Sequence, residues 1–359
     1  MPSIAKKIQS VPKKRTESLW KGPEVDGITQ SMLSRFLVCR ERFRVKYVLG
    51  LEPVKTFNHR IEYGNLWHVC EEAFAKREDW EVELGKYGLR LTRKYPLQQD
   101  DVQKWYMVCL KQFPVYVEYW KKHQDVQDRT PIFQEQVFDV PYRLPSGRTV
   151  RLRGKWDSVD LIGKGKTAGI YLQENKTTSD VDDSSIRRRM SFDLQTMLYL
   201  IALAHIEEIG SMPGRLKGVR FNVIRRPLSG GKGSIKQHQP TKSNPKGESL
   251  EDYYERLATY IREEPETYFF RWKVEISPSD VQRFKERFLN PILENLCEWY
   301  AMVSFDKNPW GEPQTGLHWQ HPFGIFNAMN EGGSTEYDEY LANGSEVGLR
   351  QTGELFPEL

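Results

Sequence analysis

The chain has 359 residues, of which 38% are hydrophobic and 12% aromatic, so it can bury one large core or two smaller ones, and wholesale disorder is excluded. Its net charge of +4 is mild and neither requires nor excludes a nucleic-acid partner, because a binding groove depends on local charge. No apolar run approaches the roughly 18 residues of a membrane-spanning helix, so we predict no membrane partner.

Two features of the sequence indicate the compartment. The four cysteines lie far apart in the chain, which predicts reduced thiols in a cytosol and not a disulfide framework. The first residues are basic but lack the apolar segment of a secretory signal. We therefore expect a cytoplasmic protein.

The N-terminal part of the chain is predicted to be a basic flexible tail, residues 1–27, followed by a helical region, residues 28–130. The apolar residues of the first helix, which we expect to begin at Thr29, recur at spacings of three and four. Two more helices are expected at residues 63–76 and 100–123.

Residues 131–225 have the pattern of an α/β core. Short runs rich in Val, Ile, Leu and Tyr, separated by turn-forming residues, predict consecutive strands at residues 133–142, 149–162 and 168–175. A helix at about residues 191–209 and a further strand at residues 216–225 follow.

The C-terminal part of the chain is predicted to begin with an irregular segment. Residues 226–248 are polar and rich in Gly and Pro, which predicts a basic flexible loop. Residues 249–359 are expected to form a helical region that closes on the N-terminal helix, with helices at residues 250–264 and 279–303. The fold class is therefore α/β, with helical elaborations before and after the core.

Asp157, Glu174 and Lys176 form the most informative pattern in the sequence. Asp157 lies on one predicted strand, and the alternation of side chains places Glu174 and Lys176 on one face of the next strand. Two buried carboxylates and an ammonium group need a compensating ligand. Mg²⁺ takes oxygen ligands and leaves positions for water and phosphate, so the pattern suits metal-assisted phosphodiester hydrolysis. The alternative is a surface strand that carries Glu and Lys by chance.

Four further residues stand where this chemistry needs them. His68, on an early helix, can supply a nitrogen ligand that permits Mn²⁺, and a packed or surface histidine is the alternative. Gln195 and Tyr199 share one helix face and can donate to phosphate oxygens, unless Tyr199 is a half-buried packing residue. Glu135, near the start of the first strand, could point toward the same site, but an ordinary exposed glutamate is the favoured interpretation.

Taken in order, these motifs resemble the RecB-type nuclease branch of the PD-(D/E)XK superfamily. The resemblance spans about residues 28–205 and is carried by Ser31…Cys39, Gly64…His68, Gly154-Lys155-Trp156-Asp157, Gln173-Glu174-Asn175-Lys176 and Gln195…Tyr199. It implies a restriction-endonuclease-like core with a central mixed β-sheet flanked by helices. It also implies a DNA exonuclease of DNA repair, recombination or phage DNA processing, from a bacterial or phage-infected cell.

The resemblance assigns a role to each residue of the site. It implies that Mg²⁺ or Mn²⁺ is ligated by four groups: the side chains of His68, Asp157 and Glu174 and the backbone carbonyl of Asn175. Lys176 would position the attacking water. Gln195 and Tyr199 would contact the DNA near the scissile phosphate.

The sequence departs from the family pattern at an iron–sulfur site. Many members hold a [4Fe-4S] cluster with one early cysteine and three late ones. Here Cys39 matches the early position, but the late positions hold His318, His321 and Asn327. Because such clusters require cysteine ligands in nearly all cases, we predict no iron–sulfur cluster. A zinc ion held by Cys39, His318 and His321 is one alternative, and packing of this segment on the N-terminal helix is the favoured one.

The expected partner is DNA, single- or double-stranded. No Walker motif is present, so a helicase or recombinase would be a separate protein. The basic loop and the triplet Arg187, Arg188 and Arg189 flank the site in sequence, and we predict that they bind the DNA backbone. The alternative function is a catalytically silent nucleic-acid-binding or assembly subunit with the same fold. Sequence-specific restriction is a third option, but nothing in the sequence predicts base readout.

Overall fold

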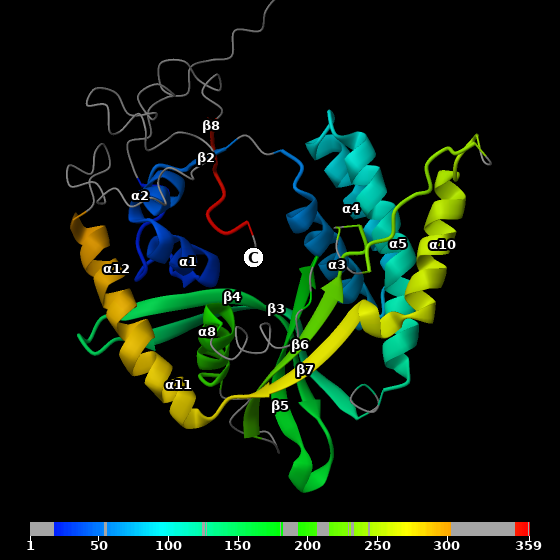
Figure 1. The fold of residues 1–359 in the computed structure, drawn as a ribbon. Coiled ribbons are helices and arrows are strands. Elements are labelled where there is room, and N and C mark those ends of the chain that lie inside the picture. Colours follow the sequence, from blue (N-terminus) through cyan, green and yellow to red (C-terminus); the bar gives the residue numbers. More distant parts are fainter. Residues whose placement is uncertain are drawn as a thin grey trace, which may run out of the picture. The chain divides into compact units, whose positions relative to one another are not determined.

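Two long strands, β3 (Arg129–Arg143) and β4 (Thr149–Ile162), carry the chain between its two compact units (Figure 1). The first unit consists of residues 1–55, 139–154 and 285–359, and the second of residues 56–138 and 155–284. The computed structural model describes residues 18–53, 56–123, 126, 128–179, 181, 193–206, 215–228, 230, 233–242, 245–302, 349–357 and 359.

The helical layer of the second unit consists of α3 (His59–Ala75), α4 (Trp80–Lys94), α5 (Gln99–Lys121) and α10 (Leu250–Glu263). Three of these helices begin at a side chain that accepts a hydrogen bond from a first-turn N–H group: Asn58, Asp79 and Ser249. The helices pack together (Figure 1), and the fully buried Trp67 of α3 contacts Phe113 and Tyr116 of α5 edge to face. Truncation of such a residue to alanine costs about 3–5 kcal/mol, so this cluster fixes α3 against α5.

The sheet of the second unit is mixed. β4 pairs antiparallel with β5 (Gly169–Thr178), β5 pairs parallel with β6 (Arg215–Arg225), and β6 pairs antiparallel with β7 (Phe269–Glu275). The helix α8 (Leu194–Leu203) lies between the parallel strands in the chain, because two parallel strands need a crossover connection. This mixed sheet flanked by helices confirms the predicted fold class.

In the first unit, the N-terminal helix packs against the C-terminal one. Thr29 caps α1 (Gln30–Val38), and the Phe36 ring lies 5.4 Å from the Trp299 ring of α12 (Asn290–Met302). Arg40 donates a hydrogen bond to Asn295 at 2.8 Å. The unit also contains β1 (Ile28–Thr29), α2 (Arg40–Phe43), η1 (Arg44–Val48), β2 (Leu51–Pro53), η4 (Lys285–Leu289) and β8 (Leu349–Gln351). The predicted packing of the segment around His318 and His321 lies outside the described residues.

The structure confirms the strands and helices predicted for the core. Among the elements that were not predicted from the sequence, α4 and β7 are the longest. Gly85 and Gly88 disfavour a helix at α4, yet a Cβ at Gly88 would lie 2.9 Å from the Tyr106 ring, so this glycine allows α4 to approach α5. The single helix predicted at residues 279–303 is three elements: α11 (Pro278–Phe284), the π-helical η4 and α12. Pro291 follows η4 and lacks the N–H of a regular helical turn.

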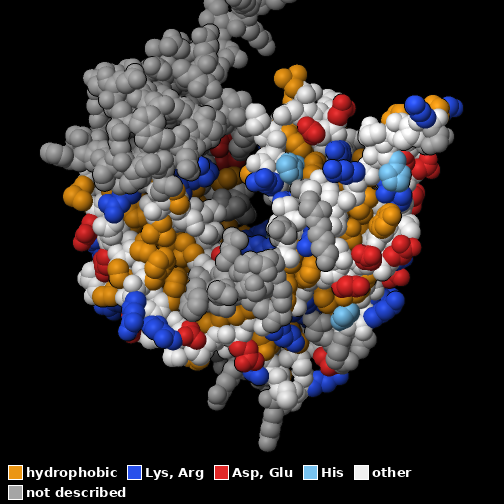
Figure 2. All heavy atoms as spheres, in the orientation of Figure 1, with side chains coloured by type: hydrophobic (Ala, Val, Ile, Leu, Met, Phe, Trp, Pro, Cys, Tyr) orange, Lys and Arg blue, Asp and Glu red, His pale blue; other side chains and the backbone are white. Residues whose placement is uncertain are grey.

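The segment between β6 and α10 is irregular, as predicted, but its described residues are tied to the second unit. Tyr253 of α10 donates to the carbonyl of the buried Ile235 at 2.9 Å, and Arg256 pairs with Glu248 at 2.6 Å. On the face shown in Figure 2, acidic and basic side chains of the described residues are interspersed, in keeping with the mild net charge. Among the described residues, no helix is both long enough and apolar enough to cross a membrane.

Candidate active site

Three residues from three elements converge in the second unit. His68 of α3 places its Nδ1 atom 3.7 Å from Oδ1 of Asp157 on β4 and 4.0 Å from Oε1 of Glu135 on β3. One ligand atom from each residue lies within 4.8 Å of the other two. We call His68, Glu135 and Asp157 the metal group. The structure thus brings together the predicted His68 and Asp157 and adds Glu135.

The pairing of β4 with β5 explains why the Asp157 carboxylate is free to approach His68 and Glu135. The two strands pair from Ile162↔Gly169 to Ser158↔Gln173, and the described pairing ends one residue before Asp157 and Glu174. Beyond that point the Asn175 N–H donates to Oδ2 of Asp157 at 2.8 Å. The side-chain carboxylate therefore accepts a hydrogen bond from a backbone N–H of β5. This bond holds it at the point where the two strands separate.

The residue before Asp157 anchors this end of β4. The Trp156 side chain is 1% exposed, and its ring stacks on Phe138 with centroids 4.5 Å apart. Its Nε1–H donates to the Tyr199 carbonyl of α8 at 3.4 Å. Because successive strand residues point to opposite faces, burial of Trp156 on the α8 side turns Asp157 toward α3.

Glu135 corrects the sequence-based interpretation. It was expected to be an ordinary exposed glutamate, but its side chain is only 2% exposed and pairs with Lys155 at 2.7 Å. Its φ of +47° lies in the left-handed region, which is unusual and costly for a residue with a side chain. This conformation interrupts the alternation of β3, so a simple inside–outside pattern could not have predicted where Glu135 points.

Glu174, Lys176 and Gln195 form a second cluster beside the metal group. Lys176 Nζ donates to Glu174 Oε1 at 2.7 Å and to Gln195 Oε1 at 2.8 Å. Gln195 Nε2 closes the triangle by donating to the same Glu174 oxygen at 2.5 Å. Asp193 caps α8 and so fixes the first turn that carries Gln195. The structure therefore brings these three predicted residues together in one cluster.

The site accumulates negative charge that the protein only partly neutralises. Desolvation raises the pKa of Glu174 to about 7 against the opposing charge of Lys176, and the Asp157 carboxylate adds to the rise. Desolvation also raises the pKa of Asp157. Desolvation lowers the pKa of His68, but the charge of Asp157 and a hydrogen bond to Glu135 outweigh it and raise the pKa to about 9. A bound cation would relieve this crowding of carboxylates.

The donor set fits a hard divalent cation. The metal group offers two carboxylates and one imidazole within the reach of a single ion. The Oε2 atom of Glu174 is buried and has no hydrogen-bond partner among the described residues. An unpaired buried carboxylate oxygen is costly unless a ligand satisfies it, so this atom needs a partner that the described residues do not supply.

The remaining predicted site residues are not part of this group. Tyr199 is 8% exposed, and its ring packs edge to face on Phe138 at 5.2 Å, so its DNA contact stays a prediction, as does ligation by the Asn175 carbonyl. Cys39 is buried in the first unit. The arginine triplet predicted to bind DNA and the two histidines of the alternative zinc site lie outside the described part of the chain: Arg187, Arg188, Arg189, His318 and His321.

Comparison with known proteins agrees with this geometry. A family model described as the PD-(D/E)XK nuclease superfamily matches residues 28–280. The chain belongs to this superfamily. Membership implies a phosphodiesterase that uses a divalent metal, and the matched range contains the metal group and the cluster around Lys176. In the family name, P denotes a proline before the aspartate; in this chain Trp156 occupies that position, directly before Asp157. No curated protein matches the chain.

Proposed function

We propose that this protein is a metal-dependent DNA nuclease of the RecB-type branch, an exonuclease that uses Mg²⁺ or Mn²⁺ in DNA repair, recombination or phage DNA processing. The observation that carries the proposal is the convergence of His68, Glu135 and Asp157 beside the unsatisfied carboxylate oxygen of Glu174. Such a donor set, next to a lysine, suits hydrolysis of a phosphodiester.

The residues that would hold the cation are the metal group, Glu174 and the backbone carbonyl of Asn175. The Asn175 N–H already faces Asp157, and in a strand the N–H and carbonyl of one residue can point to the same edge, which supports the assignment of the carbonyl. When bound, a divalent cation polarises the scissile phosphate and lowers the pKa of a water molecule.

Lys176 would orient the attacking water and place positive charge where negative charge develops on the phosphate. Two acceptors, Glu174 and Gln195, hold its Nζ atom at 2.7 and 2.8 Å, which limits the positions that the ammonium group can take. Gln195 would also donate to a phosphate oxygen. Tyr199 and the Arg187–Arg189 triplet would contact the DNA, and a separate helicase or recombinase would supply the substrate.

A cleavage assay tests this function. End-labelled linear DNA and closed circular DNA are incubated with Mg²⁺, Mn²⁺ or EDTA and with wild type, Lys176→Ala or Lys164→Ala. Lys164 is a matched control because it is 84% exposed and pairs only with Asp128 among the described residues. We expect metal-dependent loss of linear DNA that Lys176→Ala abolishes and Lys164→Ala retains.

Other outcomes of the assay point elsewhere. Cleavage of circular DNA would overturn the exonuclease assignment in favour of an endonuclease. Unchanged cleavage by Lys176→Ala would overturn the assignment of the active site to this cluster. DNA binding by a folded protein without cleavage in either metal would favour the silent binding or assembly subunit.

A further inference from the structure

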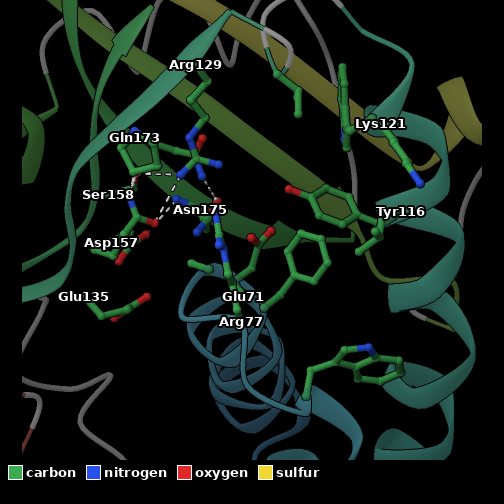
Figure 3. A pocket seen from close by; sticks show the side chains of 18 of the residues that line it. Glu71, Arg77, Tyr116, Lys121, Arg129, Glu135, Asp157, Ser158, Gln173 and Asn175 are labelled. Atoms are coloured by element: carbon green, nitrogen blue, oxygen red, sulfur yellow. Dashed lines mark hydrogen bonds between the residues drawn. The ribbon is translucent and has the colours of Figure 1, made fainter.

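A cavity of about 690 Å³ adjoins the metal group within the second unit. Figure 3 shows Asp157 and Glu135 on one side of it and Tyr116 and Lys121 of α5 on the other, with Glu71 of α3 between them. Cavities of roughly 300–1,000 Å³ typically hold one small organic molecule. The space beside the metal group can therefore take a single nucleotide but not a duplex.

One wall of the cavity is made of flat groups. Trp80, Tyr116 and Trp120 line it, and the Arg271 guanidinium lies 3.8 Å from the Trp120 ring centroid. Nucleobases stack on aromatic rings and on the planes of arginine guanidinium groups, largely regardless of sequence. This wall is therefore suited to a base.

The floor of the cavity is polar and held in place by its own hydrogen bonds. Asn175 Oδ1 accepts from Asn222 at 2.9 Å and from Gln173 at 3.3 Å. Arg129, which also lines the cavity, already has a partner, since it pairs with Asp160 at 2.8 Å. Amides and paired ions give a floor that matches the uncharged, hydrogen-bonding edge of a base better than a free phosphate.

Two cations stand at the cavity without a partner. Arg77, just after α3, and Lys121, at the end of α5, are both exposed, and neither side chain has an ion pair or hydrogen bond with any residue that the structure describes. Arg77 adopts a φ of +61°, which turns the chain where α3 ends. These side chains can bind the phosphate of a nucleotide whose base lies on the flat wall.

We propose that this cavity binds the terminal nucleotide of the DNA strand, with the base against Trp120 and Arg271 and a phosphate at Arg77 and Lys121. The proposal rests on the proposed nuclease function, because it places the next phosphodiester at the metal group. Binding of the terminal nucleotide there would make cleavage depend on a strand end, with a deoxynucleoside monophosphate as the product.

Calorimetric titration of the full-length protein in EDTA tests the cavity without turnover. The probes are dAMP and deoxyribose 5-phosphate, which lacks the base. We expect dAMP to bind at least about tenfold more tightly, because stacking is the larger contribution. Lys121→Ala and Arg77→Ala should each weaken dAMP binding by about fivefold, the upper range for an exposed ion pair.

Lys122→Ala and Arg93→Ala are the controls. Both residues are exposed and of the same type but do not line the cavity, so these variants should bind dAMP like the wild type. Equal binding of the two probes, or equal effects of Lys121→Ala and Lys122→Ala, would overturn the proposal that this cavity binds a nucleotide, even if the protein cleaves DNA. Selective dAMP binding that depends on Lys121 and Arg77 would support the nucleotide cavity even if no DNA is cleaved, and the nuclease function alone would then fail.

Discussion

Nδ1 of His68 lies 3.7 Å from Oδ1 of Asp157, and this pair joins α3 to β4 at the centre of the metal group. Asp157 also accepts the Asn175 N–H of β5 at 2.8 Å, so one carboxylate contacts both a helix and the neighbouring strand. The group forms only when these elements fold together. The same carboxylate lines the nucleotide cavity, which couples the proposed metal site to the proposed substrate site.

Asp157→Asn should remove a charged ligand while keeping an acceptor for the Asn175 N–H. We expect metal-dependent cleavage to fall by about 100-fold or more, because several kcal/mol of transition-state stabilisation are lost and about 1.4 kcal/mol changes a rate tenfold. Mn²⁺ should raise the melting temperature of the wild type but not of this variant, as measured by calorimetry. Asp128→Asn, which breaks the pair with the exposed Lys164 and leaves the metal group intact, is the control and should keep both properties.

The sequence carried enough information for the core and for half of the site. Period-two alternation placed Glu174 and Lys176 on one face, and helical spacing placed Gln195 on α8, where it meets them. The part of the site that depends on local backbone conformation could not be derived. Glu135 reaches the metal group through a φ of +47° that no periodicity encodes.

The elements that were missed share a physical cause. The seven residues of β7 form an edge strand whose burial does not alternate regularly. The glycines of α4 lower its helix propensity. Gly88 favours the helix only in the folded protein, where the absence of a side chain lets α5 pack against it. Tertiary contacts decided both segments, so local patterns could not predict them.

At position 135, a glycine variant should be more stable than an alanine variant, which is the reverse of the usual order of stability. At a φ of +47° an alanine is strained by about 1 kcal/mol or more, whereas glycine is not. We expect Glu135→Gly to be more stable to urea than Glu135→Ala, and both to bind Mn²⁺ roughly tenfold or more weakly than the wild type. An alanine variant more stable than the glycine variant would show that the left-handed conformation is not present in solution.

Gln195→Ala should release Lys176 from one of its two acceptors. Because the ammonium group then has more freedom, we expect cleavage to slow by about tenfold, in the range seen when a supporting hydrogen bond is removed from a catalytic group. DNA affinity should change less than the cleavage rate. Gln103→Ala, at an exposed position of α5, is the control. Tyr199→Phe keeps the ring on Phe138 and tests whether the hydroxyl contacts DNA through a loss of affinity alone.

The arginine triplet can be tested through the salt dependence of DNA binding. Each phosphate contact contributes about 0.9 to the slope of log K against log salt for duplex DNA, so Arg187→Ala combined with Arg188→Ala should reduce the slope by about 1.8. Fluorescence anisotropy over a series of salt concentrations measures it. The exposed pair Arg90→Ala and Arg93→Ala on α4 should leave the slope unchanged. Unchanged affinity of the first variant at low salt would remove the triplet from the DNA-binding surface.

Glu62 provides a pH-dependent contribution to stability away from the active site. Its side chain is 4% exposed and accepts hydrogen bonds from Lys94 at 2.9 Å, from Asn65 at 3.1 Å and from Tyr95. Desolvation would raise the pKa of Glu62, but the hydrogen bonds from Tyr95, Lys94 and Asn65 outweigh it and lower the pKa.

A folded-state pKa below the unfolded value of about 4.3 means that this stabilisation is present above pH 4.3 and lost as the pH falls through the folded value. Glu62→Gln should therefore lower the free energy of unfolding at pH 7 by about 2–3 kcal/mol, since it leaves the Lys94 charge without its partner. Urea unfolding between pH 7 and pH 3.5 should show this difference shrinking only below about pH 4.3. Glu83→Gln breaks the exposed pair with Lys86 and should cost less than about 1 kcal/mol at any pH. A difference for Glu62→Gln that stays constant with pH would mean that the pKa of Glu62 is the same in the folded and unfolded protein, which would contradict this prediction.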